Sequence, residues 1–145
     1  MPHQPTRYIS GTLTAALVGF SITPAATAAV TFQDIEANSH KEAILSLAEN
    51  GIIKGYPDAT FRPYAHITRG DAAVMVARTL GILDGRNIPE TSFTDLQNTN
   101  STTREAIAKL VKLEILSGYS RESFRPEESI TRAQMAKYLA NTFDL

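Results

Sequence analysis

Two arginines stand where helices are expected to begin, and the start of a helix is a place where anions bind. Arg69 and Arg132 each follow a threonine, within Thr68-Arg-Gly-Asp71 and Thr131-Arg-Ala-Gln134. Both tetrapeptides have the pattern of a capping box. A cation at this position opposes the helix dipole, so helix stability does not explain the arginines. Two explanations remain: an ion pair with a carboxylate of the protein, or a share, with the free helix amides, in holding an external anion.

The carboxylates that could pair with these arginines also occur twice. Asp34 lies in Phe32-Gln-Asp-Ile35, and Asp95 lies in Phe93-Thr-Asp-Leu96, 61 residues later. From residue 42 onward the offset is 63, and 16 of 38 positions are identical between segments 42–79 and 105–142. The chain therefore contains an internal duplication, and such repeats are expected to pack on each other.

Each copy predicts a helix, a packed loop and a second helix. The first helices are expected to start with capping boxes at Ser39-His-Lys-Glu42 and Thr102-Thr-Arg-Glu105, and Gly51 and Gly81 are expected to end helices in the first copy. Apolar side chains throughout the intervening loop favour a packed loop. We predict a mostly α fold of tandem helix-loop-helix repeats packed on each other, with a short extended segment at the start of each.

The composition of the first 28 residues differs from that of the rest. Arg7 precedes a mildly apolar stretch, which ends in small residues at Ala26-x-Ala28. This order is typical of a secretory signal peptide. We predict a signal peptide at 1–28, repeat 1 at 29–83, a linker at 84–92 and repeat 2 at 93–145. The chain is therefore expected to be exported.

The composition also excludes several classes of protein. The chain has no cysteine, which excludes a disulfide scaffold and a thiolate zinc site. Residues 29–145 carry 13 Lys and Arg against 15 Asp and Glu, a formal charge of −2 that gives no footprint for nucleic acid. His40 and His66 do not recur, and no nucleophile or phosphate-loop motif is present. We expect no enzyme activity, no metal and no cofactor.

The recurring motifs resemble those of the S-layer homology (SLH) family of bacterial surface proteins. The resemblance rests on their order and spacing, present twice, and covers nearly all of residues 29–145. It implies a helical module that binds a cell-wall polymer non-covalently, either a secondary wall polysaccharide, often pyruvylated, or peptidoglycan. The location that it implies is the cell wall or cell envelope, either periplasmic or at the cell surface. The matching segments are Phe32–Asp34, Glu42–Ile44, Gly51–Pro63 and Ile67–Asp71, followed by Phe93–Asp95, Glu105–Ile107, Ile115–Tyr119, Phe124–Pro126 and Ile130–Gln134.

The same resemblance implies which residues bind the polymer. The two arginines match that of the family's Thr-Arg-Ala-Glu motif, and Lys54-Gly55 and Ser117-Gly118 match a segment that lines its groove. Because a serine replaces the lysine in the second copy, two equivalent cationic sites are not expected. Each following tyrosine either stacks on a sugar or anchors the packed loop. The predicted polymer-binding residues are Arg69, Arg132, Lys54, Gly55, Tyr56, Gly118 and Tyr119.

The chain departs from the family pattern in three respects. Ser39 and Thr102 stand where a tryptophan is common, and Gln134 replaces the acidic residue of the motif. Family members often have three repeats, so a homo-oligomer could complete a three-repeat arrangement here. The alternative function is an adaptor that binds envelope proteins through its amphipathic helices, without direct polymer binding.

Overall fold

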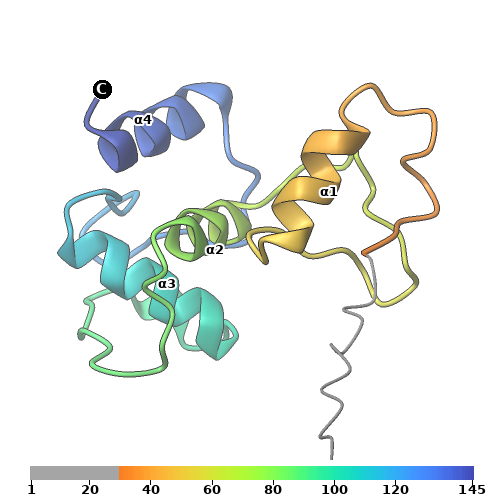
Figure 1. Cartoon of the computed structure of the whole chain (residues 1–145). Coiled ribbons are helices and arrows are strands. Elements are labelled where there is room, and N and C mark those ends of the chain that lie inside the picture. The colour runs from red at the N-terminus through yellow and green to blue at the C-terminus, as the bar shows by residue number, and fades with distance from the viewer. Residues whose placement is uncertain (1–29) are drawn as a thin grey trace, which may run out of the picture.

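The computed structural model describes residues 30–145, in which four α-helices and one short 3-10 helix occur (Figure 1). The predicted signal peptide lies outside the described residues. The helical prediction is confirmed, and the only β-bridge within 30–145 joins Thr68 to Ser129. The elements are α1 (Lys41–Glu49), α2 (Arg69–Thr79), the 3-10 helix η1 (Thr94–Leu96), α3 (Ser101–Lys112) and α4 (Arg132–Phe143).

The ends of α2 and α4 follow the sequence signals. Thr68 and Thr131 are the N-caps, and both form complete capping boxes with the third helical residue. Gly51 and Gly81 follow the C-caps of α1 and α2 with φ values of +70° and +65°. Glycine adopts this left-handed conformation without the Cβ clash of other residues, so both helices end where predicted.

The capping boxes predicted for α1 and α3 are wrong. The N-cap of α1 is His40 rather than Ser39, and its side chain makes no capping bond. In α3 the N-cap is Asn100, whose side chain accepts a hydrogen bond of 2.9 Å from the amide of Thr103. Because α3 begins earlier than predicted, Glu105 lies in its second turn and cannot reach back to the cap.

Glu105 instead fixes the start of the linker to α3. Its carboxylate accepts hydrogen bonds from the amides of Asp84 (3.0 Å) and Gly85 (2.8 Å). Lys109 lies 2.9 Å from Glu105, also pairs with Asp84, and donates to the carbonyl of Ile82 at 2.8 Å. The hydrogen bond from Lys109 lowers the pKa of Glu105, although burial opposes it. The first linker residues are therefore held against the helix of the next repeat.

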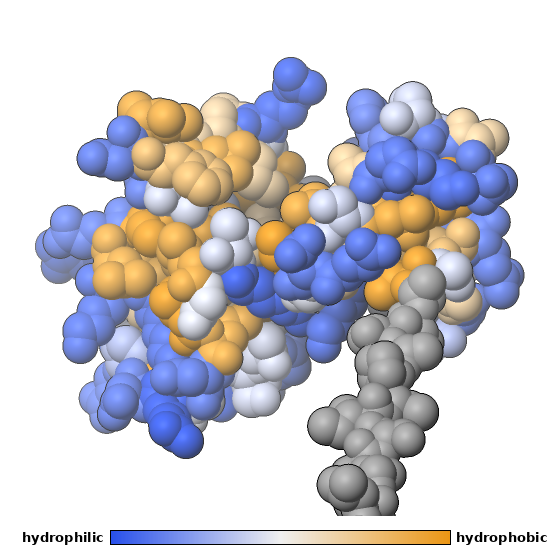
Figure 2. Space-filling view, viewed as in Figure 1, coloured by the Kyte–Doolittle hydropathy of each residue, from blue (hydrophilic) through white to orange (hydrophobic). Residues whose placement is uncertain are grey.

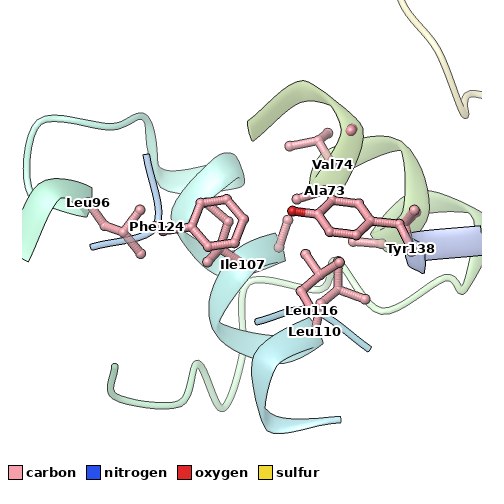
Figure 3. Packing of buried hydrophobic residues seen from close by; sticks show 12 residues of the cluster. Ala73, Val74, Leu96, Ile107, Leu110, Leu116, Phe124 and Tyr138 are labelled. Atoms are coloured by element: carbon pink, nitrogen blue, oxygen red, sulfur yellow. The ribbon is translucent and has the colours of Figure 1, made fainter. Parts of the chain in front are cut away.

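The larger hydrophobic core crosses the boundary between the repeats. Helix α2 of repeat 1 lies between α3 and α4 of repeat 2 (Figure 1). Its small residues, such as Ala73, let the larger side chains of repeat 2 approach, and Phe124, Leu110 and Tyr138 fill the space beside it (Figure 3). The buried members of this cluster are Ala72, Ala73, Val74, Val76, Ala77, Leu96, Ala106, Ile107, Leu110, Leu116, Phe124 and Tyr138.

Helix α1 packs against a second, smaller cluster. Ile35, Ile44 and Ile53 are its buried members, so the segment before α1, the helix itself and the loop after it each supply one. Phe32 and Phe61 pack beside them, with ring centres 5.4 Å apart. Most of the support for α1 therefore comes from its own repeat.

The repeated Phe-x-Asp motif holds each loop to the segment that precedes the first helix. Asp95 accepts hydrogen bonds from the amides of Phe124 (3.0 Å) and Arg125 (2.8 Å) and from the hydroxyl of Ser123. Asp34 does the same in repeat 1, with the amides of residues 61 and 62. Burial by itself raises the pKa of Asp95, but these hydrogen bonds outweigh it and hold the pKa below its usual value.

Arg69 is buried at the contact between the repeats, with 4% of its surface exposed. Its Nε donates to the carbonyl of Phe124 at 2.9 Å, and its guanidinium lies 4.6 Å from the centre of that ring. The proposed ion pair with Asp34 or Asp95 is wrong, since neither carboxylate pairs with it in the described structure. Nor are the nearby amides free: Arg69 N donates to Glu128 O, and Gly70 N to Pro126 O, both at 2.8 Å.

Replacing Arg69 is expected to destabilise the fold. Arg69→Ala removes a charged hydrogen bond to a buried carbonyl and the contact with Phe124, which together correspond to about 1.5–3 kcal/mol of unfolding free energy. Thermal unfolding followed by circular dichroism measures the effect. Arg121→Ala, at an exposed arginine, is the control and should change stability by no more than about 0.5 kcal/mol. Equal melting temperatures for the two variants would contradict the structural role of Arg69.

Asp95 should support stability only while it is ionised. At neutral pH we expect Asp95→Asn to lower the unfolding free energy by about 1.5–3 kcal/mol, because amides that now meet a carboxylate would meet a neutral amide. The folded pKa is depressed, so this stabilisation is present above the unfolded pKa of about 3.9 and is lost as pH falls through the folded value. Denaturant unfolding at several pH values checks this, with Asp144→Asn at an exposed carboxylate as control. A difference between wild type and Asp95→Asn that stays constant below pH 4 would disprove it.

Candidate functional site

A groove with a volume of about 470 Å³ runs between the loop of repeat 1, helix α2 and the start of α3. Its size lies within the range of ordinary ligand sites. Because one wall belongs to repeat 2, the groove depends on the docking of the two repeats. The lining residues are Lys54, Gly55, Tyr56, Phe61, Arg62, Pro63, Ala65, His66, Ile67, Asp71, Val74, Met75, Arg78, Asn100, Thr102 and Thr103.

The charged residues of the groove are mainly cationic. Lys54, Arg62 and Arg78 line it together with a single carboxylate, that of Asp71. The Asp71 carboxylate is already bound to the hydroxyl of Thr68 (2.8 Å), within the capping box. Lys54 is exposed and makes no ion pair within the described part of the chain. This balance of charge favours an anionic ligand.

Tyr56 lies in the groove beneath an arginine. Its side chain is 44% exposed, and the guanidinium of Arg62 lies 3.9 Å from the ring centre. Arg62 also forms a 3.0 Å ion pair with Asp58, whose pKa is lowered to about 2 by hydrogen bonds from Thr60 and Arg62. The loop therefore holds the ring, while much of the ring still contacts solvent.

The arrangement of Tyr56 and Arg62 is repeated in the second copy. The guanidinium of Arg125 lies 3.3 Å from the centre of the Tyr119 ring, and Arg125 pairs with Glu128 at 3.1 Å. Both arginines adopt φ values of +60°, a conformation that is unusual for residues other than glycine. These contacts give Arg62 and Arg125 a structural role within their own loops.

Gly55 and Gly118 have a steric reason to be glycine. A Cβ on Gly55 would lie 2.2 Å from Phe32 Cε1, and one on Gly118 would lie 2.4 Å from Phe93 Cε1. These distances are too short for any side chain, so each glycine lets a Phe-x-Asp phenylalanine pack against the loop. Both residues shape the loop regardless of any ligand.

The structure brings together only some of the predicted site residues. Lys54, Gly55 and Tyr56 line one groove. Arg69 lies in the interior. Arg132 is exposed at the start of α4, beside an apolar hollow, and Gly118 and Tyr119 lie in the loop of repeat 2. The seven residues therefore do not form one site.

Sequence reasoning missed two cationic residues near these positions. Arg78 lines the groove from the last turn of α2 and donates to the carbonyl of Ile52 at 3.3 Å. In repeat 2, Lys137 Nζ lies 3.3 Å from Ser117 Oγ, so a cation stands beside the position equivalent to Lys54. The second cation thus comes from α4 rather than from the loop, so the two positions are not equivalent. A signal was present, because the repeats exchange Lys54 and Val74 for Ser117 and Lys137.

Among residues 30–145, no group of three side chains is suited to holding a metal ion. None of their helices combines the length and the apolar character needed to span a bilayer.

Comparison with known proteins agrees with the resemblance. Residues 31–73 and 92–136 match the S-layer homology domain. The S-layer protein EA1 of Bacillus anthracis is 34% identical over 140 residues, which are 96% of this chain and 16% of that protein. The cellulosome-anchoring protein of Acetivibrio thermocellus is 38% identical over 87 residues, 58% of this chain and 19% of that protein. An amylopullulanase of Thermoanaerobacterium thermosulfurigenes is 31% identical over 94% of the chain and 7% of its own length.

The chain spans about a sixth of the S-layer relative's length, so the matching region is one part of a larger protein there. The names of these relatives are those of surface-layer, anchoring and enzyme proteins that share this region. The matches confirm the predicted cell-envelope location. With a matched segment in each of its two repeats, the chain belongs to the S-layer homology domain family.

Proposed function

We propose that the chain anchors to the cell envelope by binding a carboxylate-bearing segment of a wall polymer in the groove of repeat 1. The observation that carries this proposal is the charge of the groove: Lys54 and Arg78 make no ion pair within residues 30–145, whereas Arg62 is paired with Asp58 and the Asp71 carboxylate accepts from Thr68. Charge-assisted hydrogen bonds from Lys or Arg to a carboxylate are about twice as strong as neutral ones. Secondary wall polysaccharide or peptidoglycan would supply such groups.

Each groove residue has a separate task in this proposal. Lys54 and Arg78 supply the charge, because Lys54 has no partner within residues 30–145 and Arg78 makes one long hydrogen bond. Tyr56 offers the exposed part of its ring to the apolar face of a sugar. Gly55 keeps the loop close to Phe32, so that its neighbours face the groove. Asn100 and Thr102 add polar groups from the start of α3.

The proposal leaves Arg69 out of the direct contacts, because its guanidinium is buried against Phe124 and cannot meet a polymer. Arg69 instead stabilises the contact between the repeats, and this contact keeps the start of α3 beside the loop of repeat 1. Gly118, Tyr119 and Arg132 do not line this groove. The proposed role is binding alone, without a catalytic step.

Lys54 is expected to control retention on wall material. The full chain should co-sediment with protein-free cell-wall sacculi, and Lys54→Ala should weaken binding about tenfold, as expected for the loss of one charged hydrogen bond. Lys112→Ala removes an exposed lysine on α3 outside the groove and is the matched control. Binding should also weaken as salt rises, because the groove is open to solvent.

Mild acid extraction of the sacculi identifies the polymer. Binding that disappears after extraction would indicate an accessory polysaccharide, and binding that survives would indicate peptidoglycan. If the chain stays in the supernatant in both cases, direct polymer binding is wrong and the adaptor alternative becomes the better explanation. Equal losses in Lys54→Ala and Lys112→Ala would show that binding occurs outside the groove.

A further inference from the structure

The start of α4 is the sequence counterpart of the start of α2, but it lacks the contacts that α2 makes. At α2, Arg69 and two backbone amides bind carbonyls of residues 124–128 in the loop of repeat 2. At α4, Arg132 is exposed, and within residues 30–145 no backbone acceptor is found for the amides of Arg132 and Ala133. The same kind of helix start thus occurs twice, but only the one at α2 is in contact with a loop in residues 30–145.

The apolar face of α4 is exposed where that of α2 is buried. Ala73 and Val76 of α2 are 0% and 6% exposed, because they belong to the core that α2 shares with repeat 2. With the 63-residue offset their counterparts in α4 are Ala136 and Leu139, which are exposed, Leu139 by 44%. Figure 2 shows the resulting hydrophobic surface over α4. Together with Ile67, Ile130 and Met135, these residues line a hollow beside Arg132.

The element that would fill this site also occurs twice. In repeat 2, the face of α3 that carries Ala106 and Leu110 is fully buried in the core shared with α2. The counterparts in α1 are Ala43 and Leu47, both exposed, Leu47 by 41%. Two exposed faces of the chain therefore correspond to a contact that is buried between α2 and α3. One is the start and apolar side of α4, called the α4 face below, and the other is the apolar side of α1, called the α1 face.

We propose that the α4 face binds repeat 1 of a second copy of this chain, including its α1 face. The contact between α2 and repeat 2 within the chain predicts which residues meet, because the 63-residue offset converts each of its residues into a counterpart. Arg132 Nε would donate to Phe61 O of the second copy, and the amides of Arg132 and Ala133 to Ala65 O and Pro63 O. These bonds reproduce those of Arg69 and Gly70 within the chain.

Repeat 1 of the same chain cannot take this position. Its loop leads directly into α2, and Phe61, Pro63 and Ala65 line the groove beside Met75 and Arg78. The contact is head to tail, because α4 of one copy meets α1 and the loop of another. If two copies dock reciprocally, both contacts are satisfied in a closed dimer.

The association would also bring a helix of the second copy beside Lys137, the cation next to the loop of repeat 2. In repeat 1 the groove lies between the loop and the start of α3. In repeat 2 the corresponding residues include Ser117 and Lys137. The start of α1 from the second copy would lie beside them, where α3 lies in the first groove.

Complementation between two variants tests the proposal with the full chain and without polymer. Leu139→Asp disrupts the α4 face, and Leu47→Asp disrupts the α1 face. Sedimentation equilibrium should show concentration-dependent dimers for the wild type and at least about a tenfold weaker association for each variant. The mixture of the two variants should form heterodimers, because Leu47→Asp keeps the α4 face intact and Leu139→Asp keeps the α1 face intact. Leu113→Asp, at an exposed leucine outside both faces, is the control and should associate like the wild type.

Other outcomes would overturn the proposal. A wild-type chain that stays monomeric up to its solubility limit excludes it. Association lost in Leu139→Asp but kept in Leu47→Asp would indicate that α4 pairs with α4. Circular dichroism of each variant checks that a loss of association is not a loss of fold. Because no polymer is present, the result is independent of binding in the groove.

Discussion

The buried start of α2 is the constraint on which the rest of the structure depends. A helix start carries free amides, and here it also carries an arginine whose charge opposes the helix dipole. The loop of repeat 2 satisfies these groups with the carbonyls of Phe124, Pro126 and Glu128. This contact places α3 against the small residues of α2, and the start of α3 against the loop of repeat 1. The groove is therefore a consequence of how the repeats dock.

The Phe-x-Asp motifs explain why the loops can make this contact. Each aspartate binds two consecutive amides of its loop, around an arginine with positive φ. Each phenylalanine packs closely against a glycine of the same loop. An irregular segment thus becomes a rigid part of its repeat, with carbonyls at fixed positions. The recurrence of these residues in both copies follows from this shared geometry.

The fold was predictable from the sequence where the signals were local. The caps at Thr68 and Thr131 and the glycine stops depend on a few neighbouring residues, and they occur as predicted. The starts of α1 and α3 were missed, because Asn100 and not Thr102 caps α3 and no side chain caps α1. The partner of Arg69 was not predictable, since it is a backbone carbonyl 55 residues away and leaves no mark in the side-chain pattern. Arg78 and Lys137 were missed for a related reason, because tertiary packing brings them to the loops.

The core that crosses the repeat boundary separates the unit of sequence from the unit of folding. Each matched segment begins at a Phe-x-Asp motif and ends within the second helix of its repeat, but the larger core begins in the second helix of repeat 1 and ends in repeat 2. A recombination event at the linker would therefore divide α2 from the helix that covers it. Exchange of whole motifs between related genes can succeed only if the incoming loop still presents its carbonyls to the preceding arginine. Residues that evolve together should accordingly include pairs in adjacent motifs, such as Arg69 and Phe124, as well as the pairs within one motif.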